Sequence, residues 1–195
     1  NINAFTNIYK SLDIPFNIVN DIEELEGVKK LILPGVGAFD DAMNKFNDSG
    51  LRTPIEKMVL KNKIPILGVC VGMQMLGNAS DEGTMEGLGW VDGEVKLFDT
   101  SNIPHQTKLP HMGWNSISLV NENEPIFNQI KTRDRFYFLH SYYFKCNDDG
   151  QPIAKSNYGF NFSCALRKNN IYGVQFHPEK SLKNGIKLLY NFANL

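Results

Sequence analysis

Apolar runs alternate with helix-like patterns through the first half of this 195-residue chain. The runs at residues 16–19, 30–33 and 64–69 are short and rich in Ile, Leu and Val, as buried strands are. Around them, apolar positions recur at helical spacing, which predicts one helix ending near Leu12 and another over residues 40–48. This alternation predicts βα units that feed a mostly parallel sheet.

A third helix has a start signal in residues 53–56, Thr-Pro-Ile-Glu. Threonine is a common N-cap residue, proline is favoured at the first helical position, and a glutamate three residues after the cap completes a capping box. We therefore expect a helix with Thr53 as its N-cap.

Beyond residue 90 the helical spacing gives way to short strand-like runs separated by turn residues. They lie at residues 91–98, 114–120, 135–144, 153–156, 161–167 and 171–176, and such runs predict antiparallel strands. A last helix is expected where Ile186, Leu189, Tyr190 and Ala193 follow helical spacing, with Ser181 as its cap. No repeat or linker interrupts the pattern, so we expect one α/β domain over residues 1–195.

Charge and composition narrow the classes of partner. The chain has 20 basic and 21 acidic residues and a net charge of −1, which gives no sign of a nucleic-acid or membrane-surface partner. No run approaches the roughly 20 apolar residues of a membrane span, and no targeting signal opens the chain. Cys70, Cys146 and Cys164 fit neither a disulfide framework nor a CxxC metal pair, so we expect a reducing cytoplasm.

Residues 68–72, Gly-Val-Cys-Val-Gly, form the most informative segment, because they directly follow a buried-strand run. A strand that ends in a small-residue turn before a helix lifts one side chain out of the sheet, as in a nucleophile elbow. Here that side chain is the Cys70 thiol. The N–H of Val71 would then face a developing oxyanion, and a helix starting near Gly72 would favour the thiolate. Alternatively, Cys70 is a small buried hydrophobe.

Residues 173–179, Gly-Val-Gln-Phe-His-Pro-Glu, offer a base and a carboxylate. A free thiol is only a few per cent thiolate at neutral pH, so a cysteine nucleophile needs a base nearby. Pro178 favours an extended conformation at His177, and residues two apart in an extended chain project to the same side, so Glu179 can orient the imidazole. The sequence predicts a triad of Cys70, His177 and Glu179. Structural roles for each, or a zinc site without the usual closely spaced ligand pair, are the alternatives.

Two other features bear on this site. Residues 34–37, Pro-Gly-Val-Gly, follow a predicted strand, and the amide of Val36 or Gly37 is expected to be the second oxyanion donor. By itself, Gly-x-Gly is often only a tight turn. The remaining histidines, His105, His111 and His140, have no carboxylate at short spacing, and we interpret them as structural.

Residues 34–37, 68–74 and 173–179 together resemble the class I (triad) glutamine amidotransferases, in the same order and over nearly the whole chain. Residues 110–115, 139–142 and 179–181 are most similar to the glutaminase subunits of imidazole glycerol phosphate synthases within that family. The resemblance implies a flavodoxin-like sheet flanked by helices. It also implies hydrolysis of L-glutamine to glutamate and ammonia through a thioester, with no cofactor and no metal.

The resemblance further implies roles for individual residues. Those expected to contact the substrate glutamine are Gln74, Ser141 and Tyr142. Those expected to face a partner are Met112, Trp114, Tyr137 and Lys180. The implied partner is a (β/α)₈ barrel synthase subunit, bound as a heterodimer, which uses the ammonia to make imidazole glycerol phosphate in histidine biosynthesis. Without the family, the alternative is that Met112 and Trp114 are core residues and Lys180 is a solvated charge, and we favour the interface role.

Two departures from the family pattern stand out. Members usually begin with a strand and an Asp-Tyr turn that are not in this sequence, so we expect the domain to lack its first strand here. Val71 replaces a common leucine but leaves the backbone N–H in place. The alternatives are the same glutaminase supplying another acceptor, such as a synthase that amidates a surface sugar, a catalytically silent structural or regulatory subunit, or a stand-alone thiol hydrolase or peptidase.

Overall fold

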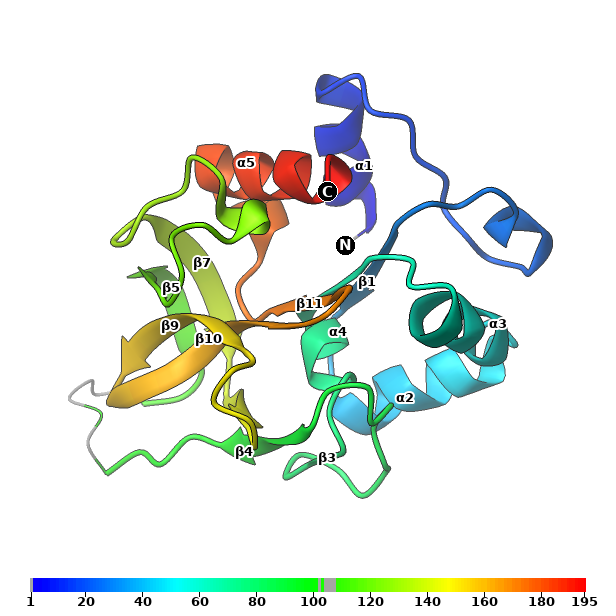
Figure 1. Cartoon of the computed structure of the whole chain (residues 1–195). Coiled ribbons are helices and arrows are strands. Elements are labelled where there is room, and N and C mark those ends of the chain that lie inside the picture. The colour runs from blue at the N-terminus through cyan, green and yellow to red at the C-terminus, as the bar shows by residue number, and fades with distance from the viewer. Residues whose placement is uncertain (1, 102, 104–107) are drawn as a thin grey trace.

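Helices pack on both faces of a mixed β-sheet in the computed structural model, which describes residues 2–101, 103 and 108–195 (Figure 1). The α-helices are α1 (Ile2–Ser11), α2 (Phe39–Asp48), α3 (Arg52–Glu56), α4 (Val71–Gln74) and α5 (Leu182–Ala193). Short 3-10 turns are η1 (Glu23–Leu25), η3 (Pro125–Phe127) and η4 (Pro178–Lys180), and η2 (Lys57–Lys61) is a π-helical turn that continues α3. His105 lies outside the described residues.

The strands of the described residues form one large sheet and one small sheet. The large sheet contains β1 (Leu31–Gly35), β2 (Ile66–Cys70), β3 (Ala79–Ser80), β4 (Gly93–Leu97), β6 (Ser118–Leu119), β8 (Tyr142–Cys146), β9 (Pro152–Tyr158), β10 (Phe160–Lys168) and β11 (Ile171–Val174). Its order is β1-β2-β11-β10-β8-β4-β3, with β9 also paired to β10 and β6 to β9. The small sheet pairs β5 (His111–Ser116) with β7 (Arg135–His140).

The parallel part of the large sheet consists of β1, β2 and β11, and this part positions the site described below. Gly35 is level with Cys70, and Val174 is level with Val69, so the chain leaves all three strands at one edge. From β11 to β4 the pairing is antiparallel. The prediction of an α/β fold with antiparallel strands in the second half is therefore confirmed.

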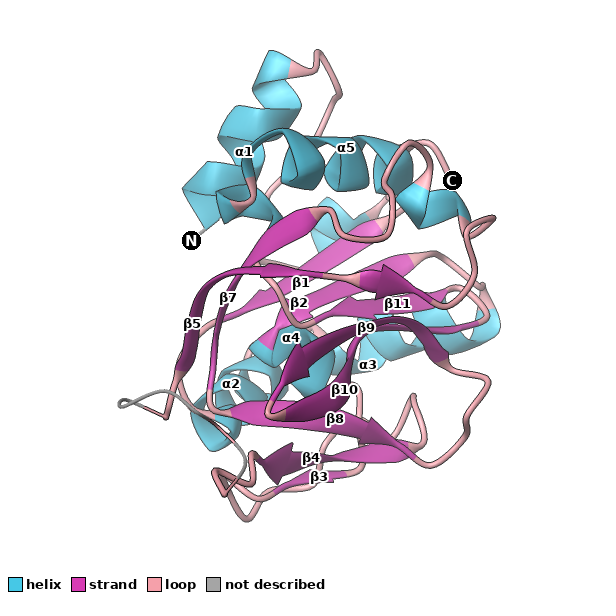
Figure 2. Cartoon of the chain, turned by 90° about the vertical axis from the view of Figure 1, so that its left-hand side faces the viewer, coloured by secondary structure: helices cyan, strands magenta, loops and turns pink. Residues whose placement is uncertain are grey.

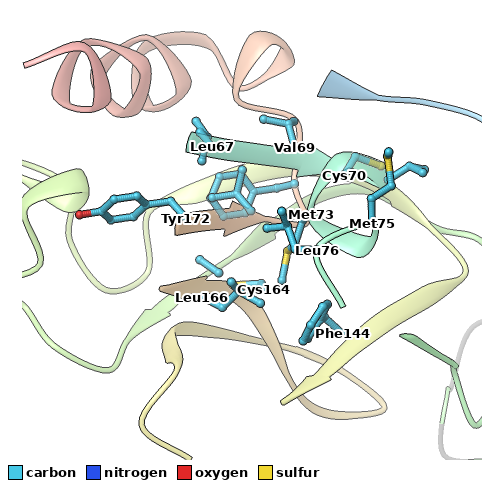
Figure 3. Close-up of a cluster of buried hydrophobic side chains, with 14 of the residues drawn as sticks. Leu67, Val69, Cys70, Met73, Met75, Leu76, Phe144, Cys164, Leu166 and Tyr172 are labelled. Atoms are coloured by element: carbon cyan, nitrogen blue, oxygen red, sulfur yellow. The ribbon is translucent and has the colours of Figure 1, made fainter. Parts of the chain in front are cut away.

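The helices divide between the two faces of this parallel region. Figures 1 and 2 both show α1 and α5 on one face and α2, α3 and α4 on the other. Every residue of β2 is buried, because helices cover it on both sides. Figure 3 shows part of the resulting core, with Leu67 and Val69 on β2 and Met73 and Leu76 nearby. No helix among the described residues is long and apolar enough to cross a membrane.

Four local predictions need correction. Residues 16–19 are not a strand, since nothing in the described chain pairs with them and an isolated strand leaves its backbone groups unbonded. Helix α3 begins at Arg52, so Thr53 lies inside it and is not its N-cap. The run at 135–144 is two strands, broken at Ser141, that belong to different sheets.

The fourth correction concerns the C-terminal helix. Helix α5 is present with Ser181 at its N-cap position, but the Ser181 hydroxyl makes no capping bond. It instead donates to the His177 carbonyl at 2.6 Å. Ile186 and Tyr190 are exposed, while the buried positions of α5 are Asn184, Gly185, Leu188, Leu189 and Phe192. Of the four predicted positions, Leu189 is buried and Ala193 packs against the core, so the predicted apolar stripe is only partly correct.

Candidate active site

Cys70 ends β2 at the sharp turn into α4 (Figure 3). Its backbone angles are φ 55° and ψ −115°, a conformation that is uncommon for a residue other than glycine and typical of a strained functional position. Gly72 lets α4 close against β1, because a Cβ there would lie 1.8 Å from the Leu33 carbonyl oxygen. The elbow therefore has the predicted geometry. The helix begins at Val71 and has only 4 residues, so its dipole is weaker than the sequence interpretation assumed.

His177 and Glu179 follow β11, the strand beside β2. The Nδ1 atom of His177 lies 2.9 Å from Oε1 of Glu179, and the two side chains are 5% and 2% exposed. Burial lowers the pKa of His177, but its hydrogen bonds and charge interactions with Cys70 and Glu179 together raise that pKa to about 9. Cys70 and His177 are thus neighbours whose side chains interact, and Glu179 holds the imidazole ring at Nδ1.

Gln175 is a component of the site that the sequence interpretation missed. It is fully buried, and its side-chain amide donates to the Cys70 sulfur at 3.8 Å. Its carbonyl oxygen accepts from Nε2 of Gln74 at 3.1 Å. Gln74 was predicted to contact substrate, and here its amide nitrogen is turned to Gln175. The signal available in the sequence was the spacing of two between positions 175 and 177, which puts both side chains on one side of an extended segment.

The two turns predicted to hold an oxyanion lie side by side. Gly35 is level with Cys70 across β1 and β2, and a Cβ on Gly35 would lie 2.3 Å from the Gly72 nitrogen. Val36 and Gly37 therefore come directly after the point of contact with the elbow. The Val36 side chain is 62% exposed, and Gly37 has φ +89°, which favours glycine at that position.

Strand β7 runs along the other side of the sulfur. The Leu139 carbonyl oxygen lies 4.0 Å from Cys70 Sγ, and the Tyr137 carbonyl accepts the His177 N–H at 2.8 Å. Ser141 and Tyr142, the other predicted glutamine contacts, occupy the bend that follows β7 and the start of β8, and both are half-buried. The structure thus places them two and three residues beyond the carbonyl that approaches Sγ.

Three of the predicted partner residues lie on the small sheet, and the fourth, Lys180, lies in η4 beside it. Met112 is 65% exposed and Trp114 is 39% exposed, so the interpretation of these two residues as core is wrong. The rings of Trp114 and Tyr137 meet edge to face with centroids 6.2 Å apart. Lys180 Nζ lies 5.7 Å from the centroid of the Tyr137 ring. Trp114, Tyr137 and Lys180 are therefore contiguous, close to the backbone that carries His177, and Met112 precedes Trp114 by two residues on β5.

The other two cysteines differ chemically from Cys70. Burial raises the pKa of the Cys146 thiol to about 11, and it raises the pKa of the Cys164 thiol as well. Neither is a good nucleophile near neutral pH, because the thiolate is the reactive form. Within the described ranges, no three or more His, Cys, Asp or Glu side chains converge as a metal site would require.

Known proteins resemble this chain over nearly its whole length. The model of the family described as glutamine amidotransferase class-I matches residues 4–194. The chain is 51% identical over 197 residues to the imidazole glycerol phosphate synthase protein HisH of Bdellovibrio bacteriovorus, covering 100% of this chain and 95% of that protein. It is 47% identical over 195 residues to the protein of the same name from Leptospira interrogans, with the same coverage of 100% and 95%.

Solved structures give a similar result for the fold. A crystal structure described as glutamine amidotransferase superposes with a TM-score of 0.74 at 19% identity, over 100% of this chain and 95% of that one. A glutamine amidotransferase from Thermotoga maritima superposes with a TM-score of 0.63 at 19% identity, over 90% of this chain and 69% of that one. At these identities the likeness concerns the fold alone.

Proposed function

Because this chain belongs to the class I glutamine amidotransferases, we propose that it is the glutaminase subunit of an imidazole glycerol phosphate synthase in histidine biosynthesis. The observation that carries the proposal is the arrangement of Cys70 at a strained elbow beside His177, whose imidazole is held by Glu179 at 2.9 Å. The names of the relatives from Bdellovibrio bacteriovorus and Leptospira interrogans supply the specific synthase. Three free cysteines are consistent with a cytoplasmic location.

The reaction follows from the chemistry of the three side chains. The Cys70 thiolate attacks the side-chain amide carbon of glutamine, and the resulting oxyanion accepts hydrogen bonds from the N–H of Val71 and of Val36 or Gly37. The His177 imidazolium donates its proton to the amide nitrogen, so that the carbon–nitrogen bond breaks and ammonia leaves a thioester on Cys70. Neutral His177 then takes a proton from water, which attacks the thioester and releases glutamate.

Glu179 supports both halves of this cycle. Its carboxylate holds the Nδ1 side of His177, so that the other ring nitrogen faces the reacting atoms. The raised pKa of His177, about 9, keeps the imidazole protonated before ammonia leaves. The half-buried residues Ser141 and Tyr142 bind the glutamine, and Gln74 acts through Gln175 to hold the sulfur.

The partner that uses the ammonia is a (β/α)₈ barrel synthase subunit. It binds this chain as a heterodimer, and its contacts are with Met112, Trp114, Tyr137 and Lys180. Apolar and aromatic side chains exposed together are typical of a protein interface. Ammonia in water at neutral pH is mostly ammonium, which is not a nucleophile, so an enclosed route to the acceptor preserves its reactivity.

The isolated glutaminase is expected to be slow. Cys70 is 5% exposed, so the amide of glutamine reaches the sulfur only when a flanking segment moves. The turn at residues 34–37 and the bend at 141 are the segments next to it. Partner binding at the adjacent small sheet then aligns the oxyanion amides and opens the site.

The test measures glutamate release from glutamine by the isolated glutaminase and by its complex with the barrel protein and the acceptor ligand. We expect Cys70→Ser to abolish glutamine-dependent synthesis, whereas the complex retains synthesis from added ammonia. Cys146→Ser is the matched control, since it alters a free thiol outside the site, and we expect it to change neither activity. Retained glutamine-dependent synthesis in Cys70→Ser would contradict the mechanism. Equal turnover with and without the partner would contradict the activation step.

A further inference from the structure

Two buried histidines outside the triad face each other across the small sheet. His111 and His140 are directly opposite in the pairing of β5 with β7. Nδ1 of His111 lies 2.9 Å from Nε2 of His140, and the residues are 4% and 6% exposed. The proposed reaction uses neither of them. Burying a pair of polar rings costs free energy unless their ring nitrogens are hydrogen-bonded.

The protonation of both rings follows from their neighbours. The Tyr142 carbonyl oxygen lies 2.6 Å from Nδ1 of His140 and can only accept, so that Nδ1 carries the hydrogen. At the other end, Nδ2 of Asn115 lies 3.2 Å from Nε2 of His111. The Asn115 amide is oriented by two further bonds, from Nδ2 to the Asn157 carbonyl at 2.8 Å and from the Ser116 N–H to Oδ1 at 2.8 Å. Nδ2 is therefore a donor, and Nε2 of His111 accepts.

These assignments close a single chain of donors and acceptors. Asn115 donates to His111, His111 donates through Nδ1 to His140, and His140 donates through Nδ1 to the Tyr142 carbonyl. Every link requires a neutral ring with its hydrogen on Nδ1. Burial, with a smaller contribution from electrostatic interaction with the other two imidazoles, of His111 and His177, lowers the pKa of His140 to about 3, which keeps that ring neutral.

The two ends of this hydrogen-bonded series lie at the proposed partner surface and at the proposed glutamine site. His111 is followed on β5 by Met112 and then by Trp114, which point outward to the proposed partner surface. His140 bonds across the bend at Ser141, where the chain passes from the small sheet to the large one. The same bend carries the proposed glutamine contacts, and Leu139 before it approaches Cys70 Sγ at 4.0 Å.

We propose that His111 and His140 form a positioning relay that holds the 140–142 bend in its glutamine-binding shape and couples this bend to strand β5 when the barrel protein docks. The inference rests on the proposed function. A displacement of β5 that did not carry His140 with it would leave a buried ring nitrogen without a partner. The pair therefore moves together, and the bend moves with the strand.

A purely packing role is the competing explanation. The His111 ring is stacked between Phe138 and Tyr158, with centroid distances of 4.8 Å and 4.2 Å. His111→Phe keeps a flat ring in that stack and removes the hydrogen bonds. His111→Asn loses the ring but keeps a side-chain N–H near the position of Nδ1. His111→Phe therefore keeps the packing and loses the hydrogen bonds, whereas His111→Asn loses the packing and keeps a hydrogen-bond donor.

The experiment measures kcat and KM for glutamine in the isolated glutaminase and in the complex with the barrel protein. We expect the stimulation by the partner to be about 5- to 20-fold lower in His111→Phe than in wild type, with a raised KM for glutamine. We expect His111→Asn to keep most of the stimulation and a KM close to that of wild type. Tyr158→Phe is the matched control, because it keeps the ring that stacks on His111 and removes only the hydroxyl, which donates to the Lys108 carbonyl at 2.7 Å, and we expect unchanged stimulation. Affinity for the barrel protein and thermal unfolding are measured for each variant.

The outcomes separate the relay from the function on which it rests. No glutamine hydrolysis by the wild-type complex refutes the proposed function. Normal hydrolysis, with His111→Phe stimulated like wild type or with both variants equally impaired, refutes the relay alone. If the variants do not fold, ¹⁵N NMR of the wild-type imidazoles at neutral pH decides the matter. Hydrogen on Nδ1 of both rings supports the relay, and hydrogen on Nε2 of either ring overturns it.

Discussion

Replacing Glu179 with glutamine tests whether this carboxylate sets the protonation of His177. The two side chains are 2% and 5% exposed, so water screens their interaction very little. The pKa of His177 is raised from 6.5 to about 9, in spite of the opposing effect of burial, by Cys70 and Glu179 together. At about 1.4 kcal/mol per unit of pKa, this rise corresponds to about 3 kcal/mol in favour of the imidazolium.

Glu179→Gln keeps the size of the side chain and removes its charge. A hydrogen bond to a charged group contributes about 1.5–3 kcal/mol, so we expect the pKa of His177 to fall by roughly one to two units. The imidazolium must protonate the departing ammonia, and a group with a pKa of about 7–8 is still at least half protonated at pH 7, so kcat/KM should fall about twofold or less at neutral pH and about 5- to 50-fold at pH 9. The alkaline limb of the pH profile should move from near 9 to about 7–8.

The assay is glutamate release by the complex as a function of pH. Glu124→Gln is the matched control, because Glu124 is also a buried carboxylate in an ion pair, at 2.9 Å from Arg167 Nη1, but lies in a different part of the chain. We expect this control to lower stability and to leave the alkaline limb where it is. An unmoved limb in Glu179→Gln would refute the assignment of that limb to the His177–Glu179 pair.

Three further outcomes follow from individual contacts. Gly72→Ala places a Cβ 1.8 Å from the Leu33 carbonyl oxygen, so urea denaturation should show a loss of roughly 2–4 kcal/mol, and a loss below about 0.5 kcal/mol would contradict the packing argument. Gln175→Met removes the N–H at 3.8 Å from the Cys70 sulfur, so alkylation of Cys70 by iodoacetamide at neutral pH should slow about tenfold, whereas an unchanged rate would exclude a role for that contact. The lowered pKa of His140 stabilises the fold above pH 6.5, and that contribution is lost as pH falls from 6.5 towards about 3, so thermal unfolding of wild type should depend on pH in this range more steeply than that of His140→Gln.

The triad segments were readable from the sequence because each directly follows a strand of the parallel region. In a parallel sheet, chain ends that leave strands in the same direction meet at one edge, so residues far apart in sequence converge without any further information. The strand register, which pairs Gly35 with Cys70 and Val174 with Val69, produces this convergence. Local pattern therefore predicted which residues would meet.

Features that depend on long-range pairing were not readable in this way. The run at 16–19 has the composition of a strand, but strand formation requires a bonded neighbour, and local pattern does not say whether one is present. The break at Ser141 is equally hidden, because the residues on both sides have strand-like composition and differ only in the sheet that they join. The contact between His111 and His140, which are 29 residues apart in sequence, likewise depends on the register in which β5 pairs with β7.

Strand β7 explains why the proposed active site and the proposed partner surface share one region. Its backbone faces the site, through the Tyr137 carbonyl bonded to the His177 N–H and the Leu139 carbonyl near Cys70 Sγ. The side chains of the same two residues lie toward the exposed surface. A two-stranded sheet has little stability of its own, so β5 and β7 are more easily displaced than the covered strands of the parallel region. A partner that binds this surface therefore acts on the backbone beside the sulfur directly, and no separate transmitting element is needed for the triad itself.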